Sequence, residues 1–176
     1  MTVATWITLS RMLGIPFLLY FLSNPTPIDR WIGLAIFSIA ALTDWVDGYV
    51  ARRFNQVSDL GKFLDPLVDK LLVFAPFLVL IEWGTIPAWG VFLILARELT
   101  VAGWRVRQTT ISGANWWGKI KTVAQITAIV LLLAPLSQAW TNAGLVAFWL
   151  SVVLTLVSGA IYLIPQMRGD EEIGSI

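Results

Sequence analysis

The sequence contains no cysteine and no histidine. Their absence excludes disulfide bonds, thiolate nucleophiles and imidazole bases, and it removes the usual ligands of zinc, copper and haem. A bound metal must therefore rest on oxygen ligands, and a general base is most readily supplied by a carboxylate. Charge is scarce as well, because 13% of the 176 residues are charged whereas 57% are hydrophobic. This composition is typical of an integral membrane protein.

Six apolar runs divide the sequence, and each is long enough to cross a hydrocarbon core about 30 Å thick, which takes about 20 helical residues. We therefore predict an all-α integral membrane protein with six transmembrane helices, forming a single domain over residues 1–176 with a short polar tail at 168–176. The predicted spans cover residues 6–22, 31–53, 60–81, 88–107, 116–136 and 145–164. Turn-forming residues separate them at 23–27, 84–87, 112–115 and 141–144.

The distribution of positive charge predicts the orientation in the membrane. Of the 12 lysines and arginines, only Arg30 lies on the side that is reached after the first span. Because cytosolic connections are enriched in Lys and Arg, both termini and the connections after the second and fourth spans should face the cytosol.

Four aspartates lie inside otherwise apolar spans, where a carboxylate is costly unless it is paired or binds a metal. Asp44 and Asp47 are three residues apart and Asp65 and Asp69 are four apart, so each pair projects from one face of its helix. The two helices are consecutive and antiparallel, and both pairs lie about 12 Å from the cytosolic ends. Converging carboxylates at low dielectric require compensating cations. We therefore predict a polar cavity, open to the cytosolic side, that holds two divalent metal ions, Mg²⁺ or Mn²⁺.

The residues between the two pairs predict a surface for a nucleotide or a phosphate. Gly48 and Ala51 follow the first pair at helical spacing and leave a shelf without large side chains. Arg52 lies one turn nearer the cytosol, where a guanidinium can bind a phosphate through two hydrogen bonds. Gly61 keeps the facing helix thin.

The full string is Asp44-x2-Asp47-Gly48-x2-Ala51-Arg52-x8-Gly61-x3-Asp65-x3-Asp69. It resembles the signature of the CDP-alcohol phosphatidyltransferases, and the resemblance extends over the whole chain. Further strings are similar to the phosphatidylglycerophosphate synthase branch of that family, and they comprise residues 65–70, 96–98, Arg105 and 118–122. One departure is Thr5, which stands where members of the family often have Asn ahead of the positions of Thr8 and Arg11. It puts in doubt an amide contact to the nucleotide.

The resemblance implies an enzyme that transfers the phosphatidyl group of CDP-diacylglycerol to an alcohol and releases CMP. Asp44, Asp47 and Asp65 would be the principal metal ligands. Asp69 would approach the second metal and accept the proton of the acceptor hydroxyl. The resemblance also implies a homodimer in the bacterial cytoplasmic membrane, with the active site facing the cytosol. The residues that would bind CDP-diacylglycerol are Thr8, Gly48, Ala51, Arg52 and Gly61.

A second basic set borders the same cytosolic mouth and predicts an acceptor that carries a phosphate. Arg97 lies well inside the fourth span, and a cation at that depth calls for an anionic partner. Glu98 points about 100° around the helix and should neutralise Arg97 only partly. The acceptor that this set and the resemblance favour is glycerol 3-phosphate. The predicted phosphate-binding residues are Arg97, Arg105, Lys119 and Lys121.

Other interpretations stay open. The aspartates would be merely structural if they paired with the basic residues of their own hairpin, and Arg105, Lys119 and Lys121 also fit ordinary cytosolic helix ends. A divalent-cation carrier would place carboxylates in a membrane too, but it needs access from both faces. Cardiolipin synthase, of the same superfamily, takes phosphatidylglycerol, which would reach the site from lipid. No feature of the sequence indicates a nucleic-acid partner. The basic hairpin residues are Arg52, Arg53, Lys62 and Lys70.

Overall fold

The computed structural model is all-helical throughout the part of the chain that it describes. It describes the backbone of residues 3–54, 59–107 and 116–173, and the side chains of residues 9–43, 67–104, 116 and 118–161. The predicted all-α class is therefore confirmed. The helices are α1 (Val3–Ser23), α2 (Pro27–Phe54), α3 (Asp59–Glu82), α4 (Ala88–Arg107), α5 (Trp116–Leu133) and α6 (Gln138–Ile173).

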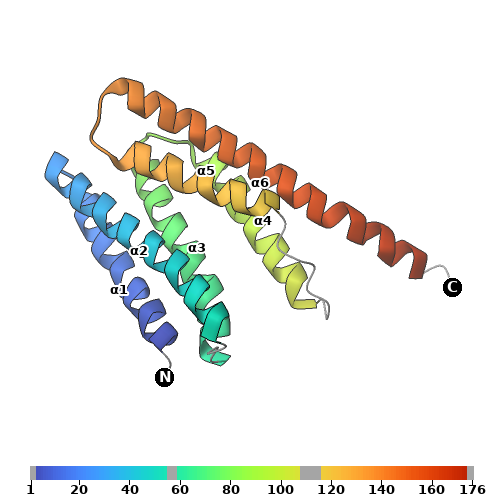
Figure 1. The fold of residues 1–176 in the computed structure, drawn as a ribbon. Helices are drawn as coiled ribbons and strands as arrows, with labels where there is room; N and C mark the ends of the chain where they lie inside the picture. Colours follow the sequence, from blue (N-terminus) through green and yellow to red (C-terminus); the bar gives the residue numbers. More distant parts are fainter. Residues whose placement is uncertain (1–2, 55–58, 108–115, 174–176) are drawn as a thin grey trace.

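The helices form two groups that α5 joins (Figure 1). In the first group α1 packs against both α2 and α3. In the second group α6 lies along α5 and also contacts α4. Because α5 contacts α2 and α3 as well, it links the two halves of the bundle. The C-terminal part of α6 extends beyond the other helices, so the two termini lie far apart (Figure 1).

The last predicted break was wrong. Residues 141–144 lie inside α6, and the chain turns instead at residues 134–137, after α5 ends at Leu133. Pro135 favours a turn at this position, because proline has no N–H to donate to a helix and disfavours helical geometry in the residue before it. Gly144 serves close packing, since a Cβ there would lie 2.8 Å from the side chain of Leu132. Helix α6 continues to Ile173, so the described part of the predicted polar tail is helical.

Local hydrogen bonds fix the two other described turns. Gly84 has a φ of 67°, and the N–H groups of Gly84 and Thr85 donate to the carbonyls of Ile81 and Leu80, which is a Schellman motif. At the start of α2, Thr26 and Asp29 form a capping box. Hydrogen bonds from the hydroxyl and the N–H of Thr26 lower the pKa of Asp29 below its ordinary value. This cap is therefore complete at neutral pH and is lost only as the pH falls through that lowered pKa.

Arg30 has a structural role at the end of the bundle that carries the fewest cations. Its Nε donates to the carbonyl of Leu133 at 3.0 Å, and its Nη2 donates to those of Leu132 and Ala134 at 3.0 and 3.3 Å. These are terminal carbonyls that the helix itself leaves without a donor, and a cation is favourable at that end of a helix. Arg30 thereby joins α2 to the end of α5 while its guanidinium lies over the ring of Trp83.

The interior of the bundle is apolar at one end and contains charged side chains toward the other. The end near Arg30 is filled by apolar side chains, among them Phe37, Phe77 and Phe148, and the rings of Phe77 and Phe148 meet edge to face. Toward the opposite end α1, α3, α4 and α5 each bring a charged side chain inward. Within the described side chains, the buried or half-buried ion pairs lie in this second half.

The outside of the bundle is apolar. Each helix exposes large hydrophobic side chains. Apolar surface spread over so many elements is unusual for a protein that is surrounded by water. By length and composition, the described part of α6 at 138–161 is the one described segment long and apolar enough to cross a membrane, and residues 9–23 of α1 form a shorter apolar helix. Outward-facing examples from α1 to α6 are Phe17, Ile39, Leu78, Phe92, Val123 and Val146, all more than half exposed.

Candidate active site

The predicted metal ligands lie on the facing parts of α2 and α3. Asp44 and Asp47 belong to the second half of α2, and Asp65 and Asp69 to the first half of α3. Both aspartate pairs are thus helical, as their spacing predicted. Asp69 is the one of the four whose side chain the structure describes. Several other predicted site residues lie outside the described side chains: Thr8, Asp44, Asp47, Gly48, Ala51, Arg52, Gly61, Asp65 and Arg105.

Asp69 is held by Arg11. Nη1 of Arg11 donates to Oδ1 of Asp69 at 3.1 Å, which joins α1 to α3. The arginine side chain is 4% exposed, whereas that of Asp69 is 46% exposed. A buried cation of this kind orients the carboxylate through a charge-assisted hydrogen bond, and the exposed part of the carboxylate can be reached by another molecule.

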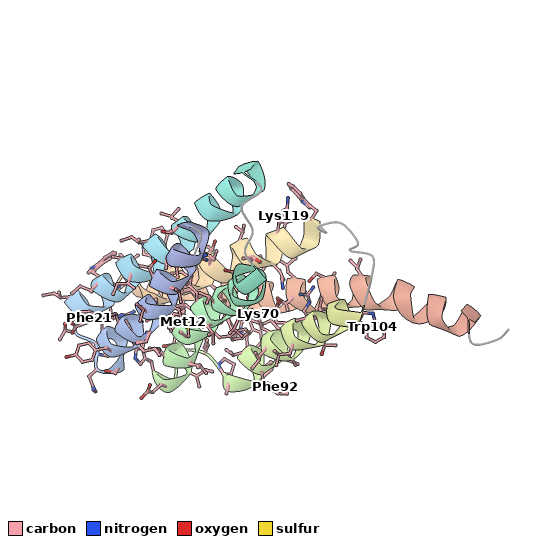
Figure 2. All side chains as sticks on the ribbon, turned by 90° about the horizontal axis from the view of Figure 1, so that it is seen from below. Met12, Phe21, Lys70, Phe92, Trp104 and Lys119 are labelled. Carbon is pink, nitrogen blue, oxygen red and sulfur yellow. The ribbon has the colours of Figure 1, made fainter. Side chains whose placement is uncertain are left out.

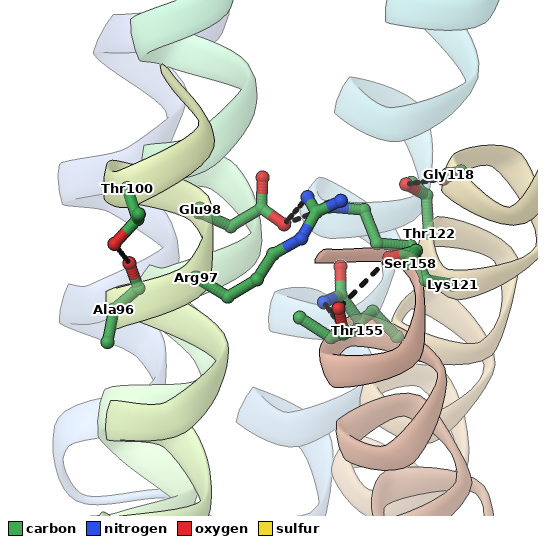
Figure 3. A network of polar contacts seen from close by, with 10 residues as sticks. Ala96, Arg97, Glu98, Thr100, Gly118, Lys121, Thr122, Thr155 and Ser158 are labelled. Carbon is green, nitrogen blue, oxygen red and sulfur yellow. Dashed lines mark hydrogen bonds and ion pairs between the residues drawn. The ribbon is translucent and has the colours of Figure 1, made fainter. Parts of the chain in front are cut away.

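Arg97 and Lys121 share one carboxylate. Nη1 of Arg97 donates to Oε1 of Glu98 at 3.0 Å, and Nζ of Lys121 donates to the same oxygen (Figure 3). Two cations from α4 and α5 thus meet on a single negative charge, and all three side chains are largely buried.

Lys70 adds a third cation to this region. It follows Asp69 on α3, and its charge lies close enough to that of Lys121 to oppose it. Figure 2 shows Lys70 on α3 in the middle of the bundle, seen from below. The described side chains of α3, α4 and α5 therefore bring three cations, Lys70, Arg97 and Lys121, into one region, and Lys70 directly follows Asp69 in α3. Converging cations of this kind suit a phosphate.

Lys119 is set apart from this cluster. It is exposed near the start of α5, and its Nζ lies 5.8 Å from the ring centre of Trp116 (Figure 2). The structure therefore brings together Arg97 and Lys121 of the four predicted phosphate-binding residues. A contact between Lys119 and the acceptor stays a prediction.

Three residues of this region were not predicted as site residues. Arg11 lies in an apolar run, and a cation at such a position indicates a carboxylate partner on another helix. Glu98 was expected to neutralise Arg97 in part, but its second bond, to Lys121 on another helix, is a tertiary contact. Gly159 of α6 lies against the stem of Arg97, at a distance from the sequence motif that no local pattern indicates.

The four predicted ligands are all carboxylates, and carboxylate oxygens are the ligands that Mg²⁺ prefers. Among the described residues there is no group of three or more acidic side chains that could hold a metal ion. Because three of the four predicted ligands lie outside those side chains, the two-metal site stays a prediction.

Comparison with known proteins defines the class. The sequence pattern of the CDP-alcohol phosphatidyltransferase family matches residues 1–157, and the chain belongs to this family. It is 40% identical to a protein of Bacillus subtilis (strain 168) over 87% of this chain and 89% of the relative. It is 36% identical to a protein of Escherichia coli (strain K12) over 92% of each chain. Both relatives are named CDP-diacylglycerol–glycerol-3-phosphate 3-phosphatidyltransferase.

The Arg11–Asp69 pair can be tested by substitution at Arg11. We expect Arg11→Met to lower kcat by about 10- to 100-fold, the usual effect of removing a group that orients a metal ligand or a reacting carboxylate. Arg11→Lys keeps a charge and a donor and should recover part of the loss. The measurement is steady-state turnover of purified protein, with thermal stability recorded alongside. A methionine variant that folds and keeps the wild-type kcat would show that the pair has no part in the reaction.

Proposed function

We propose that this protein transfers the phosphatidyl group of CDP-diacylglycerol to glycerol 3-phosphate and releases phosphatidylglycerophosphate and CMP. The observation that carries this proposal is the cation cluster in which Arg97 and Lys121 converge on one oxygen of Glu98 and the charge of Lys70 lies close to that of Lys121. The names of the relatives, which share 33–40% of their residues with this chain, support the same donor and acceptor.

The protein would act within a membrane. The outward apolar side chains of all six helices support this location, and so do the helix lengths of 18 to 36 residues, because about 20 helical residues cross a hydrocarbon core. The charged groups gathered in one half of the bundle would lie toward the cytosol, where the acceptor is soluble. The homodimer and the cytosolic position of both termini belong to the same proposal.

Asp44, Asp47, Asp65 and Asp69 would hold two divalent metal ions, Mg²⁺ or Mn²⁺. When bound, such ions would stabilise charge on the attacking and leaving oxygens of a phosphoryl transfer. The chain itself would bind the donor through Thr8, Gly48, Ala51, Arg52 and Gly61.

Asp69 would act as the general base. Its carboxylate, oriented by Arg11, would take the proton of the acceptor hydroxyl while the hydroxyl oxygen forms a bond to the phosphorus that bears diacylglycerol. The bond from that phosphorus to the oxygen of CMP breaks, and CMP leaves with the electron pair. Arg52 would stabilise the charge that develops on the leaving group.

Arg97 and Lys121 would hold the phosphate of the acceptor. Lys70 follows Asp69 on α3 and its charge lies close to that of Lys121, so a short acceptor would place its phosphate at the cluster and its hydroxyl at the base. Phosphatidylglycerol offers no terminal phosphate monoester to this cluster, which disfavours the cardiolipin synthase alternative. A carrier is disfavoured because the described buried ion pairs lie in one half of the bundle while apolar residues fill the other.

Metal removal tests the carboxylate site. We expect chelation to abolish transfer, and addition of Mg²⁺ or Mn²⁺ to restore it, because oxygen ligands alone are offered by a chain without histidine or cysteine. The readout is release of labelled CMP by protein freed of bound metal. Full turnover in excess chelator would rule out the two-metal reaction.

Arg97→Lys tests the phosphate site, because lysine keeps the charge but loses the planar fork. We expect kcat/KM for glycerol 3-phosphate to fall by about 10- to 150-fold, the equivalent of about 1.5 to 3 kcal/mol for a charge-assisted contact. KM for CDP-diacylglycerol should hardly change. The reverse outcome, in which affinity for the donor is lost and affinity for the acceptor is kept, would assign Arg97 to the donor.

A further inference from the structure

Helix α6 contributes none of the predicted site residues, yet its Gly159 lies directly against Arg97. A Cβ at Gly159 would stand 2.8 Å from Cγ, 3.2 Å from Nε and 3.6 Å from Cδ of Arg97. The arginine stem therefore crosses α6 at a position where that helix has no side chain. The side chain of any larger residue at position 159 would therefore collide with Cγ of Arg97.

Arg97 has little room to avoid such a contact. Real Cβ atoms essentially never approach another heavy atom within 3.0 Å, and the nearest atom, Cγ, is close to the backbone and cannot swing away as a side-chain tip can. The side chain is 12% exposed, and its Nη1 is bound to Glu98 at 3.0 Å. Glu98 thus binds the guanidinium of Arg97, and Gly159 packs against the stem of the same side chain.

Helix α6 cannot easily retreat either. It packs along α5, where Nε2 of buried Gln125 donates to Oγ1 of Thr155 at 3.3 Å (Figure 3). Thr155 and Ser158 are buried beside Gly159, and Ser158 donates to the carbonyl of Thr155 at 3.0 Å. Moving α6 away from Arg97 would disturb this interface, so the arginine is the part that must shift.

We propose that Gly159 is a positioning residue that sets the direction of the Arg97 guanidinium, so that α6 determines affinity for the phosphate of the acceptor. This inference rests on the proposed role of Arg97. Gly159 also lies beyond residues 1–157, the part of the chain that matches the family pattern. The space at Gly159 is thus a property of this chain that the family match does not cover.

Gly159→Ala is the direct test, and Gly144→Ala is its matched control. Both glycines are buried in α6 with the nearest atom 2.8 Å from the added Cβ, but Gly144 faces Leu132 at the opposite end of the bundle. We expect Gly159→Ala to lower kcat/KM for glycerol 3-phosphate by about 10- to 100-fold, because a small misplacement of a positioning group is costly. KM for CDP-diacylglycerol should stay within about twofold, and Gly144→Ala should change neither parameter by more than that.

A cycle with Arg97→Ala identifies the contact. That substitution removes Cγ, Cδ and Nε, the three atoms that the new Cβ would touch. In the R97A background, Gly159→Ala should therefore not lower thermal stability and should leave the residual activity unchanged. If Gly159→Ala alone does not fold, the double variant should fold with the stability of R97A. A double variant that also fails to fold would overturn the proposal.

The outcomes separate this inference from the proposed function. Wild-type protein without activity toward glycerol 3-phosphate would refute the proposed function, and the stability cycle would still test the contact between Gly159 and Arg97. Wild-type activity together with acceptor kinetics of Gly159→Ala equal to those of Gly144→Ala would refute the positioning role alone.

Discussion

Charge inside an apolar bundle is the constraint on which this structure depends. An ionised side chain among hydrophobic helices is stable only with a partner, and the partners here come from other helices or from helix ends. Arg11 binds Asp69 between α1 and α3, Glu98 binds Lys121 between α4 and α5, and Arg30 binds the terminal carbonyls of α5 from α2. These contacts hold the helices in register where nonpolar packing alone is not directional.

The same constraint produces the division between scaffold and site. Phe37, Phe77 and Phe148 fill the half of the bundle near Arg30, and this half needs no charged group in its interior. The other half carries the described ion pairs, and there Arg97 and Lys121 converge on one oxygen of Glu98. A dianionic phosphate is a ligand that such converging cations can bind. The aspartates of α2 and α3 would balance their own charge with metal ions.

Local patterns were enough to predict the helices and their number. The apolar runs gave α1 to α4 to within a few residues, and Pro27 and Gly84 mark turns whose chemistry is local. The break near Gly144 was misplaced because glycine serves either a turn or a close approach between helices, and only the position of Leu132 decides between them. Whether the helices span a membrane stays a prediction, and among the described residues the segment at 138–161 of α6 is the one that is long and apolar enough to do so.

The candidate site was predictable only where its residues form a motif. Asp69 and Arg97 stand out because each is charged within an apolar run, whereas the contacts that orient them involve Arg11, Glu98 and Gly159 on elements whose approach no sequence spacing gives. These contacts arise from tertiary packing. Only the positions of the side chains in the folded chain show which groups orient Asp69 and Arg97.

The central claim is that the cation cluster selects an acceptor bearing a phosphate. The most direct measurement compares initial rates of wild-type protein with labelled CDP-diacylglycerol and Mg²⁺, offering glycerol 3-phosphate, glycerol or phosphatidylglycerol as the acceptor. We predict rapid formation of phosphatidylglycerophosphate with the first and a kcat/KM at least about 10-fold lower with the other two, since a charge-assisted contact to phosphate is worth about 1.5 to 3 kcal/mol. Equal use of glycerol and glycerol 3-phosphate, or preference for phosphatidylglycerol, would contradict the account.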